Sequence, residues 1–179
     1  KSIDKATIAR LFEAASPKMK TYIALSLNCA WYQKDIATFR TEHLIDGYIV
    51  RDRNKTGVPT RFKLWKITKE LLKKNANGSK KSGLVFEGRN GKALLHPNSS
   101  GKGRTDAIRS EFWRLCKSLK IEGVTYSHFR DSVATYVESV AAELTSKILG
   151  HSDKRLARFY VEQGAAAVDE KLDALIDQL

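Results

Sequence analysis

The order of apolar and polar residues predicts helices at both ends of the chain and strands between them. Residues 3–15 repeat apolar side chains at the spacing of one helix face. Ser16 and Pro17 are the residue types of an N-cap and a first helical turn, and they begin a mostly apolar helix over residues 18–31. We expect that helix to lie at the centre of the fold, followed by a short helix over residues 32–39.

The pattern then changes to strand type. Two runs, residues 48–53 and 61–66, are rich in strand-forming residues and are separated by a turn-rich connector. A further strand near residues 43–45 can pair with the first run through the turn Asp46-Gly47. These runs predict a small antiparallel sheet of two or three strands.

The second half of the chain is again mostly helical. Residues 67–75 have a helical pattern, whereas residues 75–104 are rich in Gly, Asn, Ser and Lys, as in a surface loop that lies near phosphates. Thr105 caps a predicted helix that runs to residue 120. Further helices are predicted at about 126–139, 141–149, 153–163 and 165–179. The predicted fold class is mainly α (α+β), as one domain over residues 1–179 without internal repeats.

A glycine decides how two polar side chains near the C-terminus lie. In one continuous helix, His151 and Tyr160 would point in opposite directions, because nine residues make about two and a half turns. Gly150 is placed to end the first helix, and Ser152 or Asp153 can cap the next one. Two helices allow the side chains to converge, although a tyrosine of this kind taken alone is more often a core-edge residue.

Charge indicates the class of partner. Lys and Arg number 32 against 20 Asp and Glu, which gives a net charge of +12 and a pI near 9.7. A polyanion is the expected partner, with nucleic acid ahead of an acidic membrane surface, because basic residues recur in loops as well as on helices. No signal peptide or long apolar run is present, so we expect a cytoplasmic protein without membrane contact.

Metal and nucleotide chemistry have little support in the sequence. Cys29 and Cys116 lie in apolar helical contexts, which favours buried thiols over a disulfide. The histidines and cysteines lack the close pair spacing of metal sites, so no metal is expected. A phosphate-binding P-loop would need Gly and Ser or Thr where His96 and Gly103 stand. We expect no cofactor.

Three segments, in order, resemble the catalytic domain of the tyrosine recombinase (phage integrase) family. LGHSDKRLARFY resembles the family's C-terminal Leu-Gly-His segment, where the nucleophilic tyrosine follows nine residues after the histidine, here His151 and Tyr160. TYSHFRDSVATYV resembles the His-x-x-Arg segment, with Arg130 as its arginine. YIVRDRNKTGVPTRFKLWK resembles a β-hairpin whose turn carries an active-site lysine, here Lys55. The resemblance covers roughly the whole chain.

Two positions depart from the family pattern. An early arginine normally stands in Gly-x-Arg-x-x-Glu, and the matching segment 30–35 has Tyr32 at the arginine position and Asp35 at the acid. The first histidine of His-x-x-Arg maps to Ser127, with His128 one place away. The resemblance therefore predicts a site with one arginine replaced, in a slow recombinase, a rearranged one, or a relative that no longer cuts.

The resemblance implies site-specific DNA recombination or integration. Tyr160 would attack a phosphodiester to leave a 3′-phosphotyrosyl enzyme, and Arg130 would bind the non-bridging oxygens. His151 would donate a hydrogen bond or help the phenol lose its proton, and Lys55 would protonate the leaving oxygen. The family usually has a separate N-terminal DNA-binding domain. The chain starts at Lys1, so we expect a fragment that lacks it, of prokaryotic or phage origin, such as a mobile element.

Duplex DNA is the predicted partner. Basic residues of loops and helices are the predicted contacts: Lys34, Arg40, Arg53, Lys80, Lys81, Lys102, Arg104 and Lys154. Lys34 and Arg40 are also candidates for the missing arginine's role.

An alternative is a sequence-specific regulator, because LNCAWYQKDIATF resembles part of a DNA-binding helix-turn-helix. It explains only about twenty residues. The last helix, 165–179, has an apolar stripe that includes Val168, Leu172 and Leu179. We expect this stripe to pack on its own domain, while the resemblance offers docking on a neighbouring protomer in a homo-oligomer.

Overall fold

The computed structural model of the chain describes residues 1–79, 81–98, 100, 103–151 and 165–178. Its helices are α1 (Lys5–Ala14), α2 (Pro17–Cys29), α3 (Gln33–Ala37), α4 (Lys66–Asn75), α5 (Ala107–Ser118), α6 (His128–Ala141), α7 (Thr145–Ile148) and α9 (Ala165–Gln178). Short 3₁₀ helices are η1 (Thr41–His43), η2 (Arg89–Gly91) and η3 (Ala142–Leu144). The predicted helix 153–163 lies outside the described residues.

Two small antiparallel sheets complete the fold. The first has the order β1-β2-β3, from β1 (Leu44–Ile45), β2 (Tyr48–Asp52) and β3 (Pro59–Lys63). The second pairs β4 (Leu95–Pro97) with β5 (Arg104–Asp106). The prediction of a mainly α fold with a small antiparallel sheet is confirmed. The second sheet was not predicted, because three-residue strands are too short to show a period.

Helix starts follow the capping residues closely. The Ser16 hydroxyl accepts a hydrogen bond from the Met19 N–H at 3.1 Å, as predicted for an N-cap. At α5 the predicted cap is wrong by one residue. Asp106 is the cap and accepts from the Arg109 N–H at 2.8 Å, because Thr105 pairs with His96 in the sheet.

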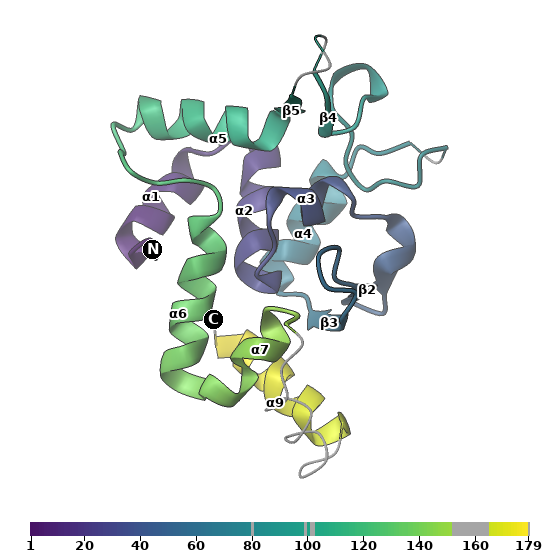
Figure 1. Ribbon diagram of the computed structural model, residues 1–179, viewed down its shortest axis with the longest axis vertical. Helices are drawn as coiled ribbons and strands as arrows, with labels where there is room; N and C mark the ends of the chain where they lie inside the picture. The colour runs from purple at the N-terminus through teal and green to yellow at the C-terminus, as the bar shows by residue number, and fades with distance from the viewer. Residues whose placement is uncertain (80, 99, 101–102, 152–164, 179) are drawn as a thin grey trace.

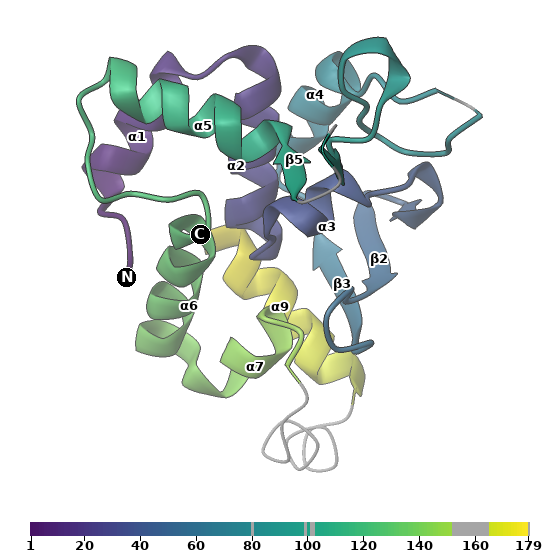
Figure 2. The same ribbon diagram turned by 45° about the horizontal axis from the view of Figure 1, so that its top comes forward.

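The central helix is α2, as the apolar pattern predicted. It packs against α1, α4, α5 and α6, and Figures 1 and 2 show it surrounded by them. Tyr22, Ile23 and Leu25 are almost completely buried. Cys29 and Cys116 are buried free thiols, as expected. No helix within the described part of the chain is long and apolar enough to cross a membrane.

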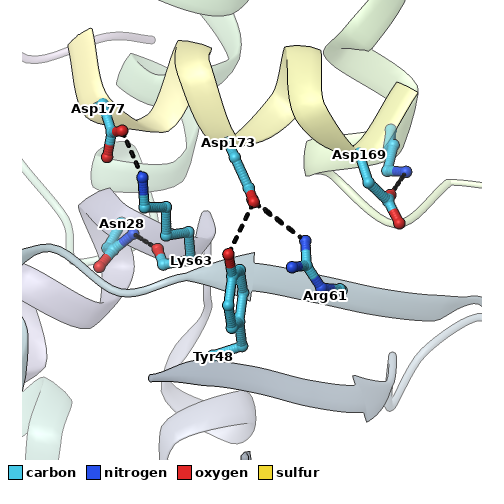
Figure 3. A network of polar contacts seen from close by, with 8 residues as sticks. Asn28, Tyr48, Arg61, Lys63, Asp169, Asp173 and Asp177 are labelled. Atoms are coloured by element: carbon cyan, nitrogen blue, oxygen red, sulfur yellow. Dashed lines mark hydrogen bonds and ion pairs between the residues drawn. The ribbon is translucent and has the colours of Figure 1, made fainter. Parts of the chain in front are cut away.

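The C-terminal helix α9 packs on its own domain beside β3 (Figure 2). Its buried apolar side chains are Val168, Leu172, Leu175 and Ile176, which confirms the expectation of packing within the chain. Leu179 lies outside the described residues. Polar contacts surround this apolar face (Figure 3). Asp173 accepts hydrogen bonds from Tyr48 at 2.9 Å and from Arg61 at 3.2 Å, and Lys63 pairs with Asp177 at 2.5 Å.

Candidate active site

Arg130 lies in the first turn of α6 and is only 3% exposed. Its guanidinium donates to the carbonyls of Ala30, at the end of α2, and Leu149, at the end of α7, the latter at 2.7 Å. Its Nη2 also lies 3.4 Å from Nε2 of His151. The guanidinium therefore joins three segments that are far apart in the sequence, and it brings together two residues of the predicted site.

Gly150 makes this approach possible. Its φ of +58° follows α7 and ends the helix, as predicted for a C-terminal glycine. A Cβ here would stand 2.7 Å from Cδ of Arg53 and 3.0 Å from Cγ2 of Thr60. The His151 N–H donates to the Ser146 carbonyl at 2.8 Å, which holds the residue beside the helix end. Only glycine allows the joint to lie this close to the hairpin.

Arg53 enters the same cluster from the turn between β2 and β3. It is 8% exposed, and its guanidinium donates to the Leu149 carbonyl that also accepts from Arg130. The Thr56 hydroxyl donates to the Gly150 carbonyl at 2.7 Å, so the turn is docked on the joint after α7. The Nε of Arg53 is buried and has no hydrogen-bond partner among the described residues.

Tyr32, which the sequence resemblance maps to an arginine position, lies beside both guanidiniums. The Cζ atoms of Arg130 and Arg53 are 4.8 Å and 5.8 Å from the centre of its ring. Asp35 accepts from the Tyr32 N–H at 3.0 Å and from the Asn54 amide at 3.2 Å. Its carboxylate thus fixes the start of α3 and the hairpin turn, while the ring contacts the two arginines.

Arg130 and Arg53 are buried without a paired carboxylate, and the pKa of each is lowered. Burial lowers the pKa of Arg130 to about 10, and the charge of Arg53 adds to this shift. Burial also lowers the pKa of Arg53, with Asp35 opposing. Among the described residues, no carboxylate forms an ion pair with either side chain. Both remain protonated at neutral pH, so the cluster has two buried positive charges and suits an anion.

The other predicted catalytic residues lie in the hairpin turn, at the start of α6 or outside the described residues. Lys55 is exposed in the hairpin turn, two residues beyond Arg53. Ser127 is the N-cap residue of α6, and its hydroxyl is 2.9 Å from that of Thr125. The ring of His128 accepts from the Thr125 N–H at 3.2 Å, so it bonds back along its own loop. Tyr160 lies outside the described residues.

The predicted DNA contacts differ in how exposed they are. Lys34, Lys81 and Arg104 are exposed, while Lys80, Lys102 and Lys154 lie outside the described residues. The Arg40 side chain is paired with Glu42 at 3.0 Å, and it donates to the carbonyl of Ser82 in a second loop at 3.2 Å. Those two contacts occupy the Arg40 side chain that was a candidate for the missing arginine's role.

A basic recess on α5 was not predicted. It measures about 490 Å³ and is lined by three arginines against one acid, with an exposed tryptophan and a serine: Arg104, Arg109, Arg114, Asp106, Trp113 (61% exposed) and Ser110. The spacing of the arginines and the exposed tryptophan could have indicated it, since such residues bind nucleic acids through phosphates and bases. No cluster of potential metal ligands occurs in the described part of the chain.

No protein-family model and no curated protein sequence matches the chain. Solved structures do. A λ integrase dimer bound to a COC′ core site is 16% identical with a TM-score of 0.66, over 89% of this chain and 47% of the other. The λ integrase catalytic core is 18% identical with a TM-score of 0.64, over 86% and 94%. The fold is that of a tyrosine recombinase catalytic domain.

A third structure shares this tyrosine recombinase fold. The Tn1549 transposon integrase in complex with circular intermediate DNA is 13% identical with a TM-score of 0.64, over 89% of this chain and 60% of the other. The chain therefore spans about half the length of the λ integrase chain in the dimer and nearly all of the catalytic core. Within this fold, the hairpin, α6 and the joint after α7 meet at Arg130.

Proposed function

We propose that the protein is the catalytic domain of a site-specific DNA recombinase that cleaves and rejoins strands through a 3′-phosphotyrosyl intermediate. The observation that carries this proposal is Arg130. It is buried beside His151 at the meeting point of three segments, and no carboxylate among the described residues pairs with it. A buried, unpaired guanidinium suits the non-bridging oxygens of a phosphodiester, on which charge develops during cleavage.

The proposed reaction balances without a cofactor. The Tyr160 oxygen attacks phosphorus, the bond to the 5′-oxygen breaks, and the phosphotyrosyl bond conserves the energy for rejoining. His151 takes the phenol proton or hydrogen-bonds the phosphate, and Lys55 gives a proton to the departing 5′-oxygen. Exposure of Lys55 in the hairpin turn leaves it able to reach a bound strand. Tyr32 stands where the family has an arginine and supplies no positive charge.

Duplex DNA is the proposed substrate. The net charge of +12 and the exposed Lys34, Lys81 and Arg104 support it, as does the α5 recess. In solved structures of the same fold, a λ integrase dimer is bound to a COC′ core site and the Tn1549 integrase is in complex with circular intermediate DNA. Assembly of several copies on DNA belongs to the same proposal, with docking of residues 165–179 on a neighbouring copy as one means.

The regulator alternative has less support from the structure. Its proposed second helix corresponds to α3, which has five residues and buries Asp35, Ile36 and Ala37. So short and buried a helix offers little surface to a DNA groove. The alternative of a recombinase relative that binds DNA without cutting keeps the same fold and surface.

Covalent capture tests the proposal. The protein is incubated with a suicide duplex, selected for binding, that loses a short fragment after cleavage. We expect a protein–DNA adduct that resists denaturation, and Tyr160→Phe abolishes it while binding persists. Tyr48→Phe, a matched change at a tyrosine that bonds Asp173, keeps the adduct. Specific binding with no adduct from the unaltered protein would support a regulator or a cleavage-deficient relative instead.

A further inference from the structure

We propose that Arg53 binds the scissile phosphate together with Arg130 and so takes the role of the arginine that Tyr32 replaces. The proposal rests on the proposed strand cleavage. Its basis is a shared position: both guanidiniums donate to the Leu149 carbonyl, and both lie against the ring of Tyr32. The Leu149 carbonyl and the Tyr32 ring thus hold the guanidiniums of Arg53 and Arg130 next to each other, although the two arginines come from different parts of the chain.

Arg51, on β2 two residues before Arg53, shows what a purely structural arginine looks like. Arg51 is 9% exposed, as buried as Arg53, and its two terminal nitrogens donate to the Asp35 carbonyl at 3.0 Å and the Thr38 hydroxyl at 3.1 Å. Arg53 donates to Leu149, but its buried Nε has no partner among the described residues. A buried donor without an acceptor costs free energy, so Arg53 is left ready for an acceptor that binds later.

The electrostatics of the pair identify that acceptor as an anion. Arg53 and Arg130 are both buried and repel each other, and the nearest acid, Asp35, is bound to the Tyr32 N–H and to Asn54. Two adjacent guanidiniums offer donors in planar forks, which match the oxygens of a phosphodiester. A phosphate between them would relieve the repulsion and give the orphaned Nε an acceptor.

The position of Arg53 also fits the chemistry of the site. It lies two residues before Lys55, and its aliphatic chain packs against Gly150, next to His151. A phosphate bound by Arg53 and Arg130 would therefore lie close to His151 and to the hairpin turn that carries the proposed general acid. The missing arginine's charge is thereby restored from the hairpin rather than from the segment before α3.

Chemical rescue on altered DNA tests this role. Single-turnover adduct formation is measured for Arg53→Ala and Arg53→Lys on the suicide duplex and on one with a neutral methylphosphonate at the scissile position. With a phosphodiester, we expect Arg53→Ala to lose about 10²- to 10³-fold in rate relative to the unaltered protein, and Arg53→Lys, which keeps the charge but not the planar fork of donors, to lose less. With the methylphosphonate, which lacks the charge that Arg53 would neutralise, the loss in Arg53→Ala should fall below about tenfold.

Arg51→Lys is the matched control, since Arg51 is equally buried in the same hairpin. It should lower the melting temperature, and its rate ratio should be equal on the two substrates. Circular dichroism of each variant establishes that it is folded. If Arg53→Ala loses the same factor on both substrates, or loses nothing, Arg53 has no role at the phosphate and the proposal is overturned.

An anion titration separates this proposal from the proposed cleavage. Inorganic phosphate is added to ¹⁵N-labelled unaltered protein, and the side-chain Nε resonances of arginine are followed. We expect saturable shifts at Arg53 and Arg130 but not at Arg51, and at least a tenfold loss of affinity in Arg53→Ala. An unresponsive Arg53 resonance overturns the proposal even if the adduct forms. Phosphate binding at Arg53 without any adduct would support the anion site while the cleavage proposal fails.

Discussion

One β-hairpin carries two kinds of buried or half-buried cation. Arg61 and Lys63 on β3 face α9 and pair with Asp173 and Asp177 (Figure 3). Arg53, in the turn after β2, meets a second arginine and has no paired acid within the described residues. Carboxylates of the protein itself neutralise the first two cations, whereas we propose that a bound anion neutralises Arg53 and the arginine beside it. Residue type alone does not separate them, but the partners do.

The directions of the pKa shifts show the same difference. Burial is the largest single influence on Arg61 and lowers its pKa, but the charge and hydrogen bond of Asp173, together with Tyr48, outweigh it and raise the pKa overall. A hydrogen bond to Asp177 raises the pKa of Lys63. Burial instead lowers the pKa of Arg53 and of Arg130. Paired cations are thus stabilised in the folded state, whereas the two arginines of the candidate site oppose folding until a ligand neutralises them.

The largest effect on stability should come from the apolar face of α9 rather than from its ion pairs. Leu172 is 1% exposed, so Leu172→Ala leaves a cavity and should lower the free energy of unfolding by about 2–5 kcal/mol. Urea unfolding measures the change. Glu170→Ala, at an exposed position of the same helix, is the control and should change it by less than about 0.5 kcal/mol. Equal, small effects would mean that the ion pairs hold the helix.

The next effect is on catalysis and contrasts two arginines. Arg130→Ala should slow single-turnover adduct formation by about 10²- to 10³-fold, because it removes a preorganised donor from the phosphate. Arg61→Ala removes a guanidinium that is already paired with Asp173 and should leave the rate within about threefold. The two variants are compared on the same suicide duplex. A similar loss in both would erase the distinction between paired and unpaired cations.

The sequence predicted most of the elements, because periodicity and capping residues specify local structure, whereas only the family resemblance placed Arg130 and His151 in one site. It identified Arg53 only as a basic residue near DNA. The contact that singles it out, a shared Leu149 carbonyl, joins residues 96 positions apart and depends on how the hairpin packs on α7. The cap of α5 was misplaced for a similar reason, since Thr105 is held by a strand pairing with His96 that the loop composition conceals.

The smallest effect tests the paired side of the comparison by pH. The hydrogen bond to Asp177 raises the pKa of Lys63 above its ordinary 10.5. A base with a raised folded-state pKa contributes stability that is fully present below the unfolded value and is lost as pH rises through the folded one. The melting-temperature difference between the unaltered protein and Asp177→Asn should therefore be constant from neutral pH to about pH 9 and should close above 10.5.

The control for this titration is Asp52→Asn, at an exposed position of the same hairpin, which should show no such closing. The shift itself should be a few degrees at most, because the pair is exposed to solvent. A difference that grows with pH would mean that the folded-state pKa of Lys63 is lowered rather than raised, and Lys63 would then belong with Arg53 and Arg130 rather than with Arg61. Closing of the difference above the ordinary lysine pKa instead places Lys63 among the cations whose charge the fold itself neutralises, which leaves Arg53 and Arg130 as the pair that needs a ligand.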